Sequence, residues 1–193
     1  MSDTKNVTAS KPGISGAIRM APIGTALPKT VDEELDQAYV TLGYISEDGY
    51  ANGNSGDSSS VKGWGGQTIF EGETSKPDTF KMKYMEYLNP DVCKMVYGDE
   101  NVDTYEDGSL KEIHANNAEV EPRVFVIDER LKDGRKARTV IPDGKPKLTE
   151  DITHKDGDPI GYGVEISAMP SELVKNKNGL PDTHATYFSR KGE

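Results

Sequence analysis

The sequence predicts a mainly β protein, an antiparallel β-sandwich or partly closed barrel with one short flanking α-helix. Apolar residues alternate with polar ones in short runs, most clearly along Ile160–Ala168, which is the pattern of a half-buried strand. Asp-Gly pairs, which are typical of hairpin turns, recur five times. Apolar residues at helical spacing stand out in one stretch, residues 89–97. The Asp-Gly pairs begin at Asp48, Asp107, Asp133, Asp143 and Asp156.

The composition bounds the class further. The chain has 193 residues, the size of one domain, and 37 of them are Leu, Ile, Val or Phe. That share is close to the level below which highly charged chains stay disordered, but the net charge of −10 is moderate for this length. We therefore expect a lean fold that shares buried surface with copies of itself. An acidic chain also argues against an ordinary nucleic-acid binder, because phosphate binding depends on clustered cations.

The N-terminal third begins with a polar segment. Residues 1–16 are predicted to be a flexible arm and residues 17–193 a single β-domain. Within that domain we expect a strand at Ala17–Ala21, a short helix or turn at Pro28–Ala38, and a strand at Tyr39–Ser46. Acidic residues in the first turn after Thr30 favour the helix, because anions are stabilised near a helix N-terminus.

A long polar stretch, EDGYANGNSGDSSS, occupies Glu47–Ser60. It has almost nothing to bury, so it is predicted to be a solvent-facing loop, and loops of this length are usually functional or mobile. Two strand pieces follow at Val61–Trp64 and Thr68–Phe70, separated by Gly65-Gly66. Phe80, Met82 and Tyr84 alternate with lysines and predict a half-buried strand.

The helix is predicted at Asn89–Tyr97. Asn89 is a suitable N-cap, Pro90 is at the first helical position and Gly98 follows the last, which is the usual order of helix signals. The rest of the chain has the pattern of strands joined by turns, and Asp133-Gly134 predicts a hairpin. The strands are expected at Val124–Leu131, Arg135–Ile141, Lys147–His154, Ile160–Ala168 and His184–Ser189.

The strand at Ile160–Ala168 has two unlike faces. Its apolar members share one face by the period of two and are predicted to lie in the core. The other face is small and polar, which suits a wall in contact with water. The core face holds Ile160, Tyr162, Val164, Ile166 and Ala168; the outer face holds Gly161, Gly163, Glu165 and Ser167.

No motif for catalysis, a metal or a cofactor is present. The three histidines are far apart in sequence, Cys93 is the single cysteine, and no activated-serine signature occurs. A calcium-loop beginning at Asp99 fails, because Thr104 replaces the required Gly and Leu110 the closing Glu. We expect neither an enzyme nor a metal or cofactor site. With no 18-residue apolar run and no secretion signal, we expect no membrane span and a cytoplasmic origin.

One charge pattern departs from the background. Between Arg130 and Lys147 lie seven of the 23 basic residues, whereas the stretch from Asp99 to Asp107 has none. A solvated hairpin and a solvated acidic loop would explain this equally well. Alternatively, the two are complementary surfaces on successive copies of the chain. The residues assigned to the contact are Arg130, Lys132, Arg135, Lys136 and Arg138.

The sequence resembles the major tail-tube proteins of siphophages that infect Gram-positive hosts. The similarity begins with GAIRMAPIGTALP at Gly16–Pro28, continues through VKGWGGQTI at Val61–Ile69 and LNPDVCKMVYGDENV at Leu88–Val102, and resumes at Pro122–Gly144 and Asp156–Pro170. Together these segments cover most of residues 16–189. Their order and spacing carry the resemblance.

The resemblance implies a self-assembling structural protein of the virion tail, produced in the host cytoplasm. It implies hexameric rings whose strands join into an inner β-barrel, stacked into a tube through which DNA passes without specific binding. Further implied partners are the tape-measure protein and the tail-terminator and tail-initiator proteins. A long loop between early strands reaches the next ring in that family. The matching residues here are Glu47, Asp48, Tyr50, Asn52, Asn54 and Asp57.

Two alternatives stay open from the sequence. A carbohydrate-binding β-sandwich would display aromatic residues on one face, but Trp64 is the single Trp and is flanked by glycines. Another phage structural protein, such as a head-completion protein, would share the composition and the strand pattern. Electron microscopy of the purified protein separates these possibilities, because tubes, rings and monomers each select one of them.

Overall fold

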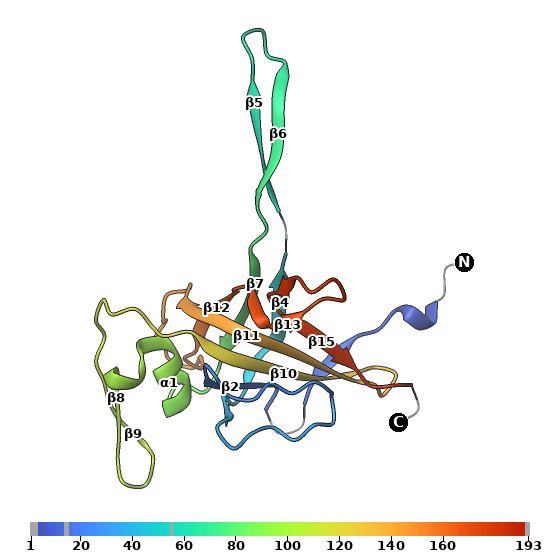
Figure 1. Cartoon of the computed structure of the whole chain (residues 1–193). Helices are drawn as coiled ribbons and strands as arrows, with labels where there is room; N and C mark the ends of the chain where they lie inside the picture. The colour runs from blue at the N-terminus through green and yellow to red at the C-terminus, as the bar shows by residue number, and fades with distance from the viewer. Residues whose placement is uncertain (1–3, 14–15, 55, 192–193) are drawn as a thin grey trace.

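A computed structural model describes residues 4–13, 16–54 and 56–191. Within them, nine strands form one antiparallel sheet in the main order β3-β2-β10-β11-β12-β7-β4, with β1 beside β10 and β15 beside β11 (Figure 1). The strands of this sheet are β1 (Ser10–Pro12), β2 (Ile18–Pro22), β3 (Val40–Thr41), β4 (Ile45–Gly53), β7 (Asp78–Tyr84), β10 (Arg123–Leu131), β11 (Lys136–Leu148), β12 (Tyr162–Ala168) and β15 (Ala185–Phe188).

The remaining strands pair two by two, and the helices are short. Each hairpin joins strands that are neighbours in sequence. The pairs are β5 (Asp57–Lys62) with β6 (Thr68–Ser75), β8 (Val102–Thr104) with β9 (Leu110–Ile113), and β13 (Ser171–Lys175) with β14 (Pro181–Asp182). The helices are η1 (Thr4–Asn6), α1 (Pro90–Tyr97) and η2 (Asp99–Asn101).

The main sheet is strongly curled. The Tyr50 hydroxyl on β4 donates a hydrogen bond to the Glu129 carboxylate on β10 at 2.9 Å. Because β4 ends the strand order and β10 lies near its other end, the sheet must bend round for these side chains to meet. The predicted mainly β, antiparallel class with one short α-helix is confirmed, and the sheet does not close into a barrel.

The core lies on the concave face of this sheet. Its largest fully buried side chains include Phe80, Tyr84, Phe125 and Tyr162. Helix α1 covers part of this face with Val92, Cys93 and Met95. The helix begins as predicted, because the Asn89 side chain accepts a hydrogen bond from the Asp91 N–H at 3.0 Å and Gly98 ends it.

Strand β10 is buried on both faces. Phe125 and Ile127 belong to the core, whereas Val124 and Val126 point to the opposite face and are also fully buried. Asp128 shares this second face with Val126 by the strand period. The segment between β2 and β3 lies over the Asp128 end of this face, where Arg138 donates to the carbonyls of Thr30 and Glu33.

The segment between β2 and β3 contains no helix, so the helix predicted at Pro28–Ala38 is wrong. Several of its backbone groups bond to side chains, and the Tyr39 N–H donates to the Asp36 carbonyl at 3.1 Å. The Lys29 N–H donates to the Glu33 carboxylate at 2.7 Å, and the Tyr39 hydroxyl donates to the Ala26 carbonyl at 3.1 Å. Burial, with Asp36 nearby, raises the pKa of Tyr39 to about 12, so this hydroxyl keeps its proton at neutral pH.

The long loop predicted at Glu47–Ser60 is also wrong. Strand β4 runs to Gly53 and β5 begins at Asp57, so most of this polar stretch is extended and paired. Strands need no apolar side chains when the partner strand satisfies their backbone groups. The flexible N-terminal segment predicted at residues 1–16 falls partly outside the described residues, and within it Ser10–Pro12 pairs with β10.

The Asp-Gly pairs divide into two kinds. Those at Asp107, Asp133 and Asp156 lie in turns, but Asp48-Gly49 is inside β4 and Asp143-Gly144 is inside β11, which continues to Leu148. A Cβ at Gly144 would lie 2.7 Å from a Phe125 ring carbon, so this glycine serves core packing. The separate strand predicted at Lys147–His154 is therefore wrong beyond Leu148.

Strand β12 confirms the predicted core face. Tyr162, Val164, Ile166 and Ala168 are buried, whereas Ile160 precedes the strand and is partly exposed.

The outer face of β12 is less open to water than predicted. The Glu150 side chain covers Gly163, where a Cβ would lie 2.5 Å from the Glu150 Cδ. Glu165 remains partly exposed, and its carboxylate lies 3.0 Å from the Lys81 Nζ.

The two faces of β12 predict different responses to charge. Val164→Asp places a carboxylate in the core and should lower the free energy of unfolding by at least ~3 kcal/mol. Glu165→Lys should cost about 1 kcal/mol, because it sets a third lysine between Lys81 and Lys147 on a partly wet face. Urea denaturation of both variants measures the difference. A larger loss for Glu165→Lys would contradict the assigned faces.

Candidate assembly surfaces

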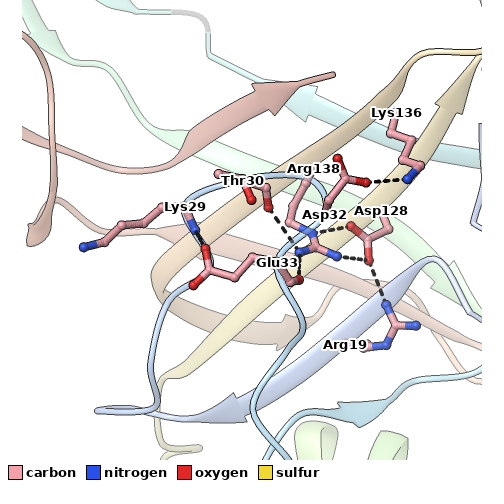
Figure 2. Close-up of polar contacts among 8 residues, drawn as sticks. All are labelled: Arg19, Lys29, Thr30, Asp32, Glu33, Asp128, Lys136 and Arg138. Carbon is pink, nitrogen blue, oxygen red and sulfur yellow. Dashed lines mark hydrogen bonds and ion pairs between the residues drawn. The ribbon is translucent and has the colours of Figure 1, made fainter. Parts of the chain in front are cut away.

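The Arg138 guanidinium joins β10, β11 and the β2–β3 segment. Its Nε and Nη2 donate to the two oxygens of Asp128 at 2.6 and 3.2 Å, and its Nη1 donates to the carbonyls of Thr30 and Glu33 at 3.2 and 2.7 Å. Arg19 donates to the same carboxylate at 2.8 Å. Figure 2 shows these contacts converging on one point. The planar fork of arginine suits this use, because it binds a carboxylate through two donors and keeps others for carbonyls.

This arrangement corrects the predicted basic contact surface. Arg138 is 8% exposed and bonded within its own chain, so it is a structural residue and is not available to a neighbour. Lys136 pairs with Asp32, and Arg135 pairs with Asp133 at 2.7 Å. Arg130 and Lys132 remain exposed, with no ion pair among the residues that the structure describes.

The exposed cations at this end of the molecule include one that the sequence did not indicate. Lys11 on β1 lies directly opposite Arg130 on β10 in the antiparallel register, and both side chains are exposed. The two residues are 119 positions apart in the chain. No local pattern could have predicted this neighbour, because β1 is a three-residue strand with polar composition.

The β5–β6 hairpin, residues 57–75, projects far from the body of the molecule (Figure 1), and we call this hairpin the arm. Most of the residues predicted to contact the next ring lie below it. Glu47 and Asp48 are exposed on β4, and Asn54 follows that strand. Tyr50 and Asn52 turn toward the body, where the Asn52 amide donates to Asp78 at 2.8 Å. Asp57 is the first residue of β5.

The outer half of the arm exposes apolar side chains. Val61 and Phe70 are cross-strand partners, and both are more than half exposed. Trp64 is fully exposed in the turn, where Gly65 and Gly66 have φ values of 113° and 85°. The sequence held a signal for this hairpin, because two β-rich pieces flank a glycine-containing turn. Because the residues before Val61 are polar, the projecting element was predicted at Glu47–Ser60 and not at the β5–β6 hairpin.

The β8–β9 hairpin forms an acidic projection at the other end of β10. Asp103 on β8 lies directly opposite Glu112 on β9. Glu100, Glu106 and Asp107 are exposed around them. The hairpin is anchored at its base by Arg123, whose Nη2 lies 2.6 Å from the Asp99 carboxylate.

Three ligand-type atoms gather on this hairpin, from Asp103, Glu112 and His114, all within 4.8 Å of one another. All three side chains are exposed, and the His114 Nε2 lies 3.3 Å from the Glu112 carboxylate. An exposed pair of acids with one histidine is also what a charged hairpin produces without a metal. Nothing buried orients these groups, so their arrangement does not define a metal centre.

A cavity of about 580 Å³ lies where β4 approaches β1 and β10. Its wall includes Tyr50, Ile127 and Glu129. Burial, with Glu129 nearby, raises the pKa of Tyr50, so its hydroxyl stays a donor to Glu129. In the cavity lining, the Ser46 hydroxyl donates a hydrogen bond to the Asp48 carboxylate two residues along β4, at 3.0 Å. The cavity marks the seam of the curled sheet.

Comparison with known proteins identifies a family. A sequence model described as phage tail tube protein matches residues 2–176, almost the whole chain. No curated protein matches the sequence. In the part of the chain that the structure describes, no helix has the length and apolar character needed to cross a membrane.

The Arg138 network predicts a stability difference between two nearby arginines. Arg138→Met leaves Asp128 with fewer donors and two carbonyls without theirs, and should lower the free energy of unfolding by about 2–4 kcal/mol. The control Arg135→Met removes an exposed pair on the same hairpin and should cost less than about 1 kcal/mol. Urea denaturation checks both, and equal losses would show that the network does not hold the β2–β3 segment.

Proposed function

The chain belongs to the phage tail tube protein family and is a structural protein of the virion tail; we propose that it assembles into stacked hexameric rings forming the conduit for DNA ejection. Assembly takes place in the host cytoplasm. The tape-measure protein fills the growing tube, and tail-terminator and tail-initiator proteins bind its ends. The protein has no catalytic role.

The arm is the single observation that carries the polymerisation proposal. A two-stranded hairpin is marginally stable alone in water, and this one ends in Trp64, Ile69 and Phe70, all exposed. Exposed apolar groups of this kind mark contact sites. In the proposed tube, the arm reaches the next ring and buries these side chains against it.

Open sheet edges support ring formation. Strand β4 ends the strand order on one side and the two-residue β3 on the other. Unpaired edges are templates for pairing with another chain unless they are covered. Joining edges between subunits would satisfy these groups and would build the continuous inner barrel of the ring.

The charge of the chain suits a conduit. A net charge of −10 disfavours retention of DNA, because phosphates are repelled by an acidic surface. DNA then passes without specific binding. The basic residues still exposed, Arg130 and Lys132, contact a neighbouring subunit in this proposal, with Arg135 and Lys136 flanking them.

A carbohydrate-binding module is the second candidate that the sequence left open. Such sites place aromatic rings on a rigid concave face, whereas Trp64 lies at the tip of a thin arm. The family match favours a tail tube over a head-completion protein.

Negative-stain electron microscopy of the purified full-length protein tests the proposal. The expected result is tubes, or isolated rings with a central channel, that form without another component. A protein that remains monomeric at high concentration and binds glycans on an array would support the carbohydrate-binding alternative and contradict the tube.

The apolar tip of the arm predicts an assembly defect without a folding defect. Trp64→Ser with Phe70→Ser removes side chains that are exposed in the monomer, so the melting temperature should change little. Because buried aromatic anchors contribute about 2 kcal/mol or more to an interface, the concentration needed for tube formation should rise at least ~10-fold. Light scattering against protein concentration measures this.

The matched control changes exposed leucines away from the arm. Leu173→Ser with Leu180→Ser removes apolar surface of similar exposure from the β13–β14 hairpin and should leave assembly unchanged. If the arm variant assembles at the same concentration as the control, the arm does not make the contact between rings.

A further inference from the structure

Besides Arg130 with Lys136, whose lysine is paired with Asp32, two cross-strand pairs in the described strands join residues of the same charge. On the main sheet, Lys11 of β1 faces Arg130 of β10. On the small hairpin, Asp103 of β8 faces Glu112 of β9. Like charges directly opposite in a sheet are destabilising, and all four side chains are exposed. Neither position is explained by the packing of the single chain.

The surroundings strengthen each pair. Lys132 is exposed beside Lys11 and Arg130, and its N–H donates to the Ala9 carbonyl at 2.8 Å. This places it close to the same β1–β10 edge. We call Lys11, Arg130 and Lys132 the basic end.

Glu100, Glu106 and Asp107 are exposed around Asp103 and Glu112. We call these five residues the acidic end. Lys111 is the basic residue that β9 itself carries, so the acidic end keeps an excess of negative charge.

The two ends cannot meet within one chain. Arg123 begins β10 and contacts Asp99 at the base of the acidic hairpin, whereas Arg130 is seven residues further along the same strand. At about 3.3 Å per residue, this part of the strand spans ~23 Å. Figure 1 shows the β8–β9 hairpin and the N-terminal segment on opposite sides of the molecule.

We propose that the basic end of one copy binds the acidic end of the next copy. This rests on the proposed self-assembly and names the surfaces that meet. A contact between unlike patches at opposite ends of one subunit is heterologous, and repeating it gives a ring or an open filament. Each contact places opposite charges beside the two like-charge pairs and removes the repulsion that each has in the free chain.

A second copy is a better match for the basic end than nucleic acid. Both complementary surfaces belong to the same chain, and no other component is needed to satisfy them. The chain as a whole is acidic, which opposes the approach of a phosphate backbone. The exposed charges make association sensitive to salt, because screening acts over about 10 Å at 0.1 M.

Charge reversal at each end tests the pairing. The first variant carries Asp103→Lys, Glu106→Lys and Glu112→Lys. With Lys111, these lysines outnumber the remaining Glu100 and Asp107, so both ends of this variant are basic. The second carries Lys11→Glu and Arg130→Glu, so both of its ends are acidic. Each variant keeps a like-charge pair at the altered position, and its melting temperature should therefore stay close to that of the unmodified protein. Lys155→Glu with Lys177→Glu, at exposed turn positions, is the control for changed net charge.

Sedimentation velocity and electron microscopy are then applied to each variant and to their equimolar mixture. Each variant alone should associate at least tenfold more weakly than the unmodified protein and the control. The mixture should recover association, because every junction again joins opposite charges. Assembly of either variant alone at the unmodified concentration would overturn the pairing, and so would a mixture of folded variants that stays dissociated.

These outcomes also separate this inference from the proposed function. Tubes from the unmodified protein and from both variants would leave the tube standing and reject the pairing. Association of the mixture into species that never form tubes would support the pairing and reject the tube. Binding of a labelled DNA duplex by the unmodified protein, lost on Lys11→Glu with Arg130→Glu, would assign the basic end to phosphate and also overturn the pairing.

Discussion

The fold depends on burying both faces of β10. A curled sheet can place one face of a strand in its core, but the other face needs a separate cover, and here the irregular segment between β2 and β3 covers its Asp128 end. Arg138 holds this cover by donating to two of its carbonyls while it pairs with Asp128. A helix would satisfy its own carbonyls, whereas an irregular segment over apolar residues must find donors elsewhere. The buried Arg138 guanidinium supplies these donors, and for that reason it is not available for a contact at the surface.

The predictions that succeeded are those for elements whose conformation is set by neighbouring residues in the sequence. Helix α1 was predictable because its cap, its proline and its terminal glycine lie within ten residues of one another. The faces of β12 and the turn at Asp133-Gly134 are also local patterns. The segment at 28–38 is different, because its conformation depends on Arg138, more than 100 positions away. Acidic residues after Thr30 resemble a helix start, but Asp32 pairs with Lys136 instead.

The candidate assembly surfaces could be predicted from the sequence only in part. The sequence indicated a concentration of basic residues but could not tell which of them fold inward; Arg138 does, while Arg130 stays outside. It also could not place Lys11 beside Arg130, since strand pairing across the chain sets that neighbour. The exposed arm was recognisable from the glycine turn between two β-rich pieces. Composition alone pointed instead to Glu47–Ser60, because polar strands and polar loops share the same residue types.

In the proposed tube, the apolar tip of the arm and the charged ends have different roles in the contacts between subunits. The apolar tip of the arm contributes affinity, because burial of aromatic area is favourable in almost any orientation. The charged ends contribute selection, because opposite charges favour one register and like charges oppose the others. In the free chain, the arm exposes Trp64 while Lys11 and Arg130, and Asp103 and Glu112, repel each other. In the monomer, therefore, the like-charge pairs repel each other and the apolar tip of the arm stays in water. A neighbouring subunit in the correct orientation relieves the charge repulsion and also buries the exposed apolar surface.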